Sequence, residues 1–89
     1  MKTKEQIDMM IKDLQEIKPR VRHFTFFGDN NQEAIEAQIW VLQSNAIEND
    51  VWNRFSEEEE YQRSLALDAT DWIDGKNENL LSDWQELIV

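Results

Sequence analysis

Three regularly spaced carboxylates are the residues of this sequence that most resemble a metal-binding pattern. Asp68, Asp71 and Asp74 follow one another at intervals of three residues, and oxygen ligands of this kind are the ones that magnesium prefers. In a helix, however, each three-residue step falls about 60° short of a full turn. The three carboxylates then spread around the helix and do not converge on one ion. We therefore expect no metal site here and interpret the three aspartates as surface charge that can face a partner.

A run of four acidic residues, Glu57, Glu58, Glu59 and Glu60, directly follows Ser56. The spacing of Ser56 and Glu59 is that of a capping box, in which the two residues satisfy backbone groups at a helix start. Negative charge is also favourable there because it complements the helix macrodipole. The run is therefore explained as the start of a helix. The same charges can contact a basic partner, so the four glutamates join the three aspartates as candidate partner-binding residues.

The residue types that most cofactor and covalent chemistry requires are missing. The chain has no cysteine and one histidine, His23, which excludes thiolate zinc sites, thiol nucleophiles and multi-histidine metal sites within one chain. The local sequence fixes neither a nucleophile nor a carboxylate beside His23, and Gly28 is too isolated to form a phosphate-binding loop. We expect a protein that is not an enzyme and holds no cofactor or metal. An enzyme would need an unforeseen pocket that joins His23 to convergent carboxylates.

Four tryptophans are hard to bury completely in a core built from 89 residues. Trp40 lies beside the apolar band of its predicted helix, and Trp52 broadens the apolar stripe of the next one. An indole left on the surface would mark a contact site, because tryptophan is enriched among residues that dominate binding energy. We select Trp40 and Trp52 as candidate interface residues.

Residues 18–27 mix basic and aromatic side chains, a combination that is typical of single-stranded nucleic-acid binding. The net charge of -10 opposes phosphate binding. The charge is also uneven, since residues 1–27 hold six basic and four acidic groups and residues 28–89 hold three and fifteen. We expect the basic side chains to pair with the acidic helices. The acidic surface should attract a protein with a basic surface, and neither nucleic acid nor a membrane is an expected partner.

The composition predicts one helical domain over residues 1–89. A hydrophobic content of 40% is too high for a disordered chain. No apolar run approaches the roughly 18 residues of a membrane span, and the charged N-terminal segment does not resemble a signal peptide. We expect a cytoplasmic protein.

Apolar residues recur at helical spacing in five segments. The predicted helices run from Thr3 to Lys18, ending at Pro19; from Asn30 to a bend near Ser44; from Asn45 to Phe55; from Ser56 to Gly75; and over residues 80–88. The second has a band wide enough to be buried against two neighbours, which predicts a central helix.

Residues 20–27 interrupt this helical pattern because they are rich in aromatic and β-branched side chains. They are either an extended linker, held across the second helix by its aromatic residues, or a short strand. One strand cannot form a sheet alone, so a strand here would have to pair with a second copy of the chain.

Several short segments resemble a pattern found in small uncharacterised acidic proteins of phages and mobile elements. The residues that carry the resemblance are Pro19-Arg20-Val21-Arg22, Phe27-Gly28-Asp29-Asn30, Ala34-Ile35, Ala37-Gln38-Ile39 and Val41-Leu42, followed by Ala66-Leu67-Asp68-Ala69, Trp72, Gly75 and Trp84. The resemblance implies no catalytic residue. It implies a biological setting that slightly favours a partner-binding or inhibitory role.

Together these observations predict an all-α fold, a small bundle of four to five short helices with one extended aromatic segment at about residues 20–27. The predicted function is an acidic, non-catalytic protein-binding module, with a homodimer as an open possibility. The alternative is a nucleic-acid mimic whose carboxylates imitate phosphates and inhibit a host DNA-binding protein or nuclease. A mimic requires acidic groups in rows roughly 6 to 7 Å apart.

Overall fold

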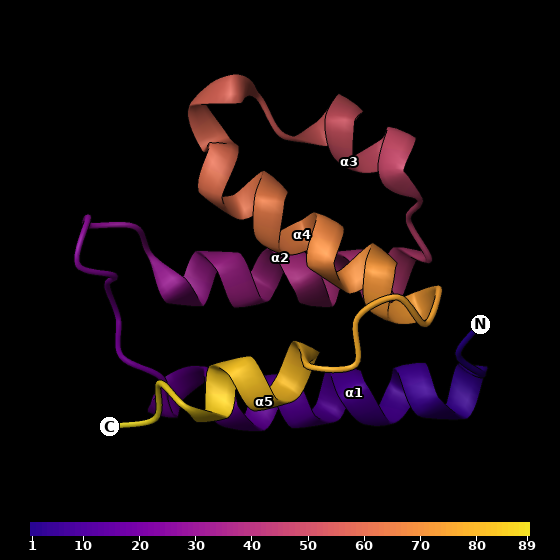
Figure 1. Ribbon diagram of the computed structural model, residues 1–89, viewed down its shortest axis with the longest axis horizontal. Coiled ribbons are helices and arrows are strands. Elements are labelled where there is room, and N and C mark those ends of the chain that lie inside the picture. The colour runs from indigo at the N-terminus through magenta and orange to yellow at the C-terminus, as the bar shows by residue number, and fades with distance from the viewer.

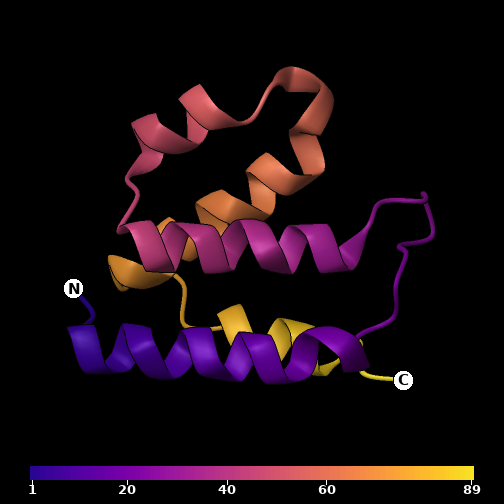
Figure 2. The ribbon, with the colours of Figure 1, turned by 180° about the vertical axis from the view of Figure 1, so that it is seen from behind.

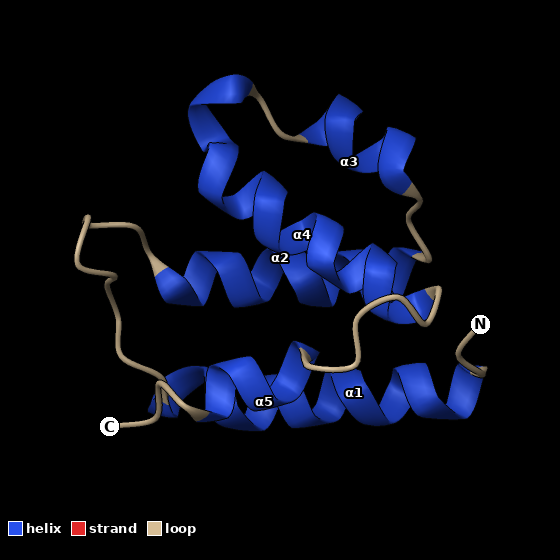
Figure 3. Ribbon diagram, viewed as in Figure 1, coloured by secondary structure: helices blue, strands red, loops and turns tan.

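The computed structural model describes residues 1–89 and contains helices and loops but no strand (Figures 1 and 3). The five α-helices are α1 (Lys4–Ile17), α2 (Asn31–Ser44), α3 (Glu48–Arg54), α4 (Glu60–Ile73) and α5 (Leu80–Gln85), with short 3-10 turns at Lys18–Arg20 and Glu57–Glu59. The prediction of an all-α bundle is confirmed. No helix is both long and apolar enough to cross a membrane.

Helix α2 is the centre of the molecule, as its wide apolar band predicts. It lies between α1 on one side and α4 on the other (Figures 1 and 2). Eight of its residues are buried: Asn31, Ala34, Ile35, Ala37, Gln38, Ile39, Val41 and Leu42. A helix with neighbours on two sides must be apolar over most of its surface, which explains why polar residues are few between Ala34 and Leu42.

The remaining helices complete two sides of this core. α5 lies against α1 and contributes the buried side chains of Leu80 and Trp84. α3 lies on the outer side of α4, away from α1 (Figures 1 and 2), and Val51 is its only buried residue. α3 is therefore peripheral, although its sequence pattern is as regular as that of the other helices.

Most helix ends lie where local sequence predicts them. Thr3 and Gln6 form a reciprocal capping box, in which the Thr3 N–H donates to Gln6 Oε1 at 2.8 Å and the Gln6 N–H donates to Thr3 Oγ1 at 3.2 Å. Gly75, with φ of +81°, closes α4: its N–H donates to the carbonyl of Trp72, and the next N–H donates to that of Asp71. This pair of bonds is a Schellman motif, which favours glycine at the left-handed position.

The role of Asn45 differs from the prediction. It does not begin α3 but ends α2, with φ of +53° and its N–H bonded to the carbonyl of Val41. Asparagine is favoured at helix starts and also tolerates the left-handed conformation at helix ends, so its presence alone does not distinguish the two. α3 instead begins at Glu48, and the residue before it, Ile47, is exposed and lies outside the core.

The prediction that residues 20–27 are held across α2 is wrong. Val21 is buried and bridges to Ile88 of the same chain, where the Arg22 N–H donates to the Leu87 carbonyl at 3.0 Å. The C-terminal residues therefore supply the pairing that seemed to require a second copy. Beyond His23 the chain leaves the helical core and forms a projecting loop before α2 (Figure 1).

Candidate functional site

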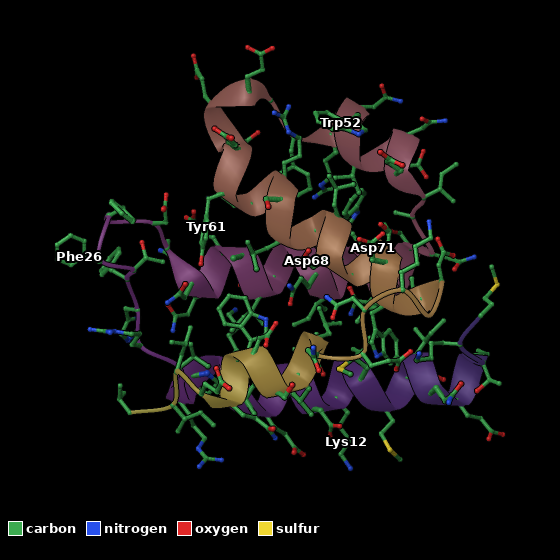
Figure 4. All side chains as sticks on the ribbon, in the orientation of Figure 1. Lys12, Phe26, Trp52, Tyr61, Asp68 and Asp71 are labelled. Carbon is green, nitrogen blue, oxygen red and sulfur yellow. The ribbon has the colours of Figure 1, made fainter.

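The projecting loop ends in a β-turn that presents two phenylalanines to solvent. The Gly28 N–H donates to the Thr25 carbonyl at 3.0 Å, which places Phe26 and Phe27 at the two central positions of the turn. Their side chains are 95% and 87% exposed and contact each other edge to face, with ring centroids 5.5 Å apart. Figure 4 shows Phe26 at the outer edge of the molecule. We call residues 24–28 the phenylalanine turn; Phe24, at its base, is 57% exposed.

The phenylalanine turn is held by hydrogen bonds across its base. The Thr25 N–H donates to the Asp29 carbonyl at 2.9 Å, and the Asp29 N–H donates back to Thr25 Oγ1 at 3.0 Å. Below this pair, the Asn31 N–H donates to the His23 carbonyl at 2.8 Å. Gly28 has φ of +88°, a conformation that glycine adopts without strain. These bonds fix the backbone of the turn, from which the two exposed rings project.

Asn31 connects this turn to the core. Its side chain is fully buried, and Nδ2 donates to the Arg22 carbonyl at 2.9 Å. Its Oδ1 accepts the hydroxyl hydrogen of Tyr61, on α4, at 2.6 Å. Burial raises the pKa of Tyr61, and the negative charge of Asp29 raises it further. Tyr61 is therefore a neutral hydrogen-bond donor that ties α4 to the base of the turn.

An acidic groove of about 610 Å³ adjoins the phenylalanine turn. Its lining comes from four segments: residues 28–30 at the end of the loop, the first turn of α2, the 3-10 turn Glu57–Glu59 and the start of α4. Five carboxylates contribute, those of Asp29, Glu33, Glu57, Glu58 and Glu60, and no basic residue does. Tyr61 is the one apolar contributor. The groove is thus a concentrated region of negative potential beside two exposed aromatic rings.

Three of the four predicted glutamates, Glu57, Glu58 and Glu60, line this groove, whereas Glu59 does not. The Glu59 carboxylate accepts hydrogen bonds from the Ser56 N–H and Oγ at 3.0 and 3.2 Å. The predicted cap at Ser56 is therefore present, and it removes one glutamate from the acidic groove.

Of the three predicted aspartates, Asp68 and Asp71 lie near each other on α4 (Figure 4), and Asp74 is exposed at the end of the helix. The pKa of Asp68 is raised, chiefly by burial and then by the charges of Asp71 and Asp83. Asp83 comes from α5, so the structure adds a carboxylate that helical spacing could not reveal. No group of three or more acidic, histidine or cysteine residues is arranged to hold a metal ion.

Replacing Asp68 with asparagine is expected to stabilise the protein. Because the pKa of Asp68 is raised on folding, its ionised form opposes folding at neutral pH, and this penalty is relieved as the pH falls through the raised value. We expect Asp68→Asn to raise the free energy of unfolding near pH 7 by up to about 1 kcal/mol, a modest gain because water screens part of the charge. Urea denaturation at several pH values measures it.

The control for this prediction is Asp74→Asn, which removes the same charge from an exposed position of the same segment. Its gain should be smaller. The difference between wild type and Asp68→Asn should vanish at low pH, where both side chains are neutral. A loss of stability for Asp68→Asn at pH 7 would contradict the assignment of Asp68 as an unfavourably placed charge.

The two selected tryptophans lie away from the phenylalanine turn and are partly covered by arginines of the same chain. Trp52, on α3, is 50% exposed, and the guanidinium of Arg63 lies 4.3 Å from its ring centroid. Trp40 is half-buried against Phe55, and Arg54 lies 4.2 Å from its ring. Figure 4 shows Trp52 on the opposite side of α4 from α1. Trp52 therefore lies apart from the acidic groove, whereas Trp40 lines a neighbouring hollow that shares Glu33 and Gln62 with the groove.

The sequence predicts that the basic side chains of residues 18–27, the basic segment, pair with the acidic helices. One of them does so. Lys18 forms an ion pair with Glu36, whereas Arg20 and Arg22 are exposed and belong to none of the three ion pairs in the structure. His23 is exposed as well and does not line the acidic groove. The basic segment therefore remains accessible next to the phenylalanine turn.

The sequence interpretation missed the phenylalanines as surface residues and missed Asp29 and Glu33 as partners of the glutamate run. One feature could have identified the turn: Phe26 and Phe27 directly precede four turn-forming residues, Gly28 to Asn31. No local pattern could have brought Asp29 next to Glu57, because α2 and α3 separate them in the sequence.

Comparisons with known proteins identify no relative of this chain. No family model, no curated protein and no solved structure matches the chain. What the site does must therefore be argued from its geometry and charge.

Proposed function

We propose that this chain is a non-catalytic protein-binding module that docks onto a basic protein surface through the phenylalanine turn and the acidic groove. The observation that carries the proposal is the exposure of Phe26 and Phe27 on a hydrogen-bonded turn. Two adjacent, almost fully exposed phenylalanines are unfavourable in water. Burial of each in a partner would contribute about 1.5 to 3 kcal/mol.

Two further features support binding to a protein. The turn is ordered by its own hydrogen bonds, so little conformational entropy is lost when a partner covers it. The acidic groove next to it would attract lysines and arginines, accelerate encounter and fix the orientation of docking. Apolar anchors surrounded by complementary charge are typical of specific protein interfaces.

The charge of the chain disfavours the other classes of partner. A net charge of -10 repels both nucleic-acid phosphates and anionic lipid headgroups. The setting implied by the resemblance to proteins of phages and mobile elements remains a prediction, and it is compatible with binding to a host protein.

The test compares three forms of the full-length chain as bait: wild type, the double variant Phe26→Ser/Phe27→Ser, and Met9→Ser. Met9 is a matched control because it is an exposed apolar residue on α1, outside the site. Captured proteins are identified by mass spectrometry, and the affinity of the purified partner is measured for each form. We expect the double variant to keep its helical circular dichroism spectrum and to bind at least about 30-fold more weakly.

Met9→Ser should bind like wild type, and higher salt should weaken binding because ions screen the acidic groove. A partner that binds the double variant with unchanged affinity would exclude the phenylalanine turn as the anchor. Release of the partner by duplex DNA would instead favour the nucleic-acid mimic.

The same variants decide whether a second copy of the chain covers the turn. Sedimentation of wild type and double variant reports the oligomeric state directly. A dimer that dissociates on Phe26→Ser/Phe27→Ser would assign the turn to self-association and would overturn the proposal of a separate partner at this site.

A further inference from the structure

A small cavity of about 120 Å³ lies between α4 and α5, with Gln38 of α2 also contributing to its lining. Its apolar lining comes from Tyr61, Leu65, Leu80, Trp84 and Leu87, and its polar lining from Gln38, Asn77, Asp68 and Asp83. Leu80 and Trp84 are buried, whereas Asp68 is half-buried and Asp83 is exposed. The buried end of the cavity is therefore apolar, and its solvent side, which we call the mouth, carries two carboxylates.

The polar atoms at the buried end already have partners within the chain. Gln38 Nε2 donates to the Leu65 carbonyl at 3.0 Å, and Gln38 Oε1 accepts the indole hydrogen of Trp84 at 2.6 Å. The one buried side-chain polar atom of the chain without a partner, Gln32 Oε1, does not line the cavity. The buried end therefore favours an apolar group, because a polar group there would lose its hydrogen bonds to water.

The carboxylates at the mouth lack a positive partner. Neither Asp68 nor Asp83 belongs to any of the three ion pairs in the structure. Burial raises the pKa of Asp68, and the charges of Asp71 and Asp83 raise it further. A cation at the mouth would offset this repulsion between neighbouring carboxylates.

The direction of entry decides which end of a ligand carries the charge. A ligand enters from the mouth, so its leading end comes to rest against Leu80 and Trp84 and its trailing end beside the carboxylates. A side chain with the charge at its tip, such as lysine, would place its ammonium at the apolar end, which is unfavourable. The cavity therefore suits a molecule whose apolar end enters first and whose ammonium follows.

The volume of the cavity sets the size of the apolar end. A single water needs roughly 10 to 15 Å³ on this measure, and a cavity of about 150 Å³ accepts benzene. The slightly smaller cavity between α4 and α5 should then accept an alkyl group of about four or five carbons.

We propose that this cavity binds a primary alkylammonium ion, with its alkyl group against Leu80 and Trp84 and its ammonium at the mouth. Two sources share this chemistry. One is a free monoamine, and the other is the first residue of a polypeptide, in which an apolar side chain such as that of leucine sits on the carbon that bears the free α-ammonium. No residue of the phenylalanine turn lines the cavity, so the proposal does not require the partner proposed above.

The first test titrates the ¹⁵N-labelled protein with 3-methylbutylammonium chloride, which reproduces the side chain, Cα and ammonium of an N-terminal leucine. The reporter is the indole N–H signal of Trp84, and that of Trp52, on α3 and outside the cavity, is the internal control. At constant ionic strength and neutral pH we expect a saturable shift at Trp84 and none at Trp52. A dissociation constant of about 1 to 20 mM is reasonable for so few non-hydrogen atoms.

Two further probes test the charge and the orientation. 3-Methyl-1-butanol has the same alkyl group without the charge and should bind at least about threefold more weakly. 1,4-Diammoniobutane carries a charge at both ends and should also bind at least about threefold more weakly, because one ammonium would have to enter the apolar end. Equal affinity for either probe, or no saturable shift with 3-methylbutylammonium, would overturn the proposal.

Two variants test the position of the ammonium. Asp68→Asn should weaken binding of 3-methylbutylammonium at least about threefold, whereas Asp74→Asn, the exposed control outside the cavity, should change it less than about twofold. Loss of folding does not confuse the outcome, because Asp68→Asn is expected to stabilise the chain. Unchanged affinity in Asp68→Asn would contradict the placement of the ammonium at the mouth.

Leucinamide and leucine distinguish the two sources of the ligand. Leucinamide carries an amide where a polypeptide would continue. Affinity within about threefold of that of 3-methylbutylammonium would assign the cavity to an N-terminal residue, and no binding of leucinamide would assign it to a free monoamine. Leucine should bind more weakly than leucinamide, because its carboxylate is repelled by Asp68 and Asp83.

Discussion

Replacing Gln38 with alanine is expected to lower the free energy of unfolding by about 3 kcal/mol, the largest effect that we predict for a single substitution. Gln38 is 1% exposed and joins three helices, because α2 carries it, the Leu65 carbonyl belongs to α4 and the Trp84 indole to α5. Alanine would leave a void, remove the bond to the Leu65 carbonyl and leave the buried indole N–H of Trp84 without its acceptor. Urea denaturation followed by circular dichroism measures the change.

Gln43→Ala is the matched control, since Gln43 is an exposed glutamine on the same helix. Its effect should stay within about 0.5 kcal/mol. A second comparison separates lost hydrogen bonds from lost volume: Trp84→Phe removes the indole donor, so part of its effect should disappear when it is combined with Gln38→Ala. Strictly additive effects would show that the 2.6 Å bond between the two side chains contributes little to stability.

Replacing Asn31 with alanine is expected to cost about 2 kcal/mol and also to loosen the phenylalanine turn. Asn31 is fully buried, and the substitution removes the partner of the Tyr61 hydroxyl and of the Arg22 carbonyl. The backbone bonds of the turn remain possible, but the side chain that fixes its base is gone. Amide hydrogen exchange at Thr25 and Asp29 should therefore accelerate more than exchange in the middle of α2.

Two further variants serve as comparisons for this prediction. Asn53→Ala, at an exposed position of α3, should change stability by no more than about 0.5 kcal/mol. Tyr61→Phe removes one of the two bonds of Asn31 and should cost about 1 kcal/mol. Unchanged exchange at Thr25 in Asn31→Ala would mean that the turn is ordered by its backbone bonds alone.

The features that the sequence predicts correctly are those determined over a few residues. The capping box of Thr3 and Gln6, the cap at Asn30 and the closing turn at Gly75 all involve neighbours three to five positions apart. The central position of α2 also follows from one segment, because a band of apolar residues that wide requires burial on two sides.

One error concerns the exposure of a residue type, and others concern contacts between distant segments. Phe24, Phe26 and Phe27 belong to a residue type that is usually buried, yet the hydrogen bonds of the turn direct them outward. Val21 bridges to Ile88, and Asp83 lies close to Asp68, only because α5 packs against α1. Of the candidate site, Glu57, Glu58 and Glu60 were therefore predicted, whereas Asp29, Glu33 and the exposure of the phenylalanines were not.

The peripheral position of α3 divides the molecule into parts of unequal stability. Val51 is the one buried residue of this helix, and its other contacts are made by partly exposed side chains, so detaching the helix exposes far less apolar surface than global unfolding does. Such a subglobal opening would withdraw Arg54 and Phe55 from the ring of Trp40, which is half-covered in the closed form. Trp40 would then be accessible only in a minor state of the native ensemble. The population of that state, set by how weakly α3 is held, would govern how often this second aromatic surface is presented.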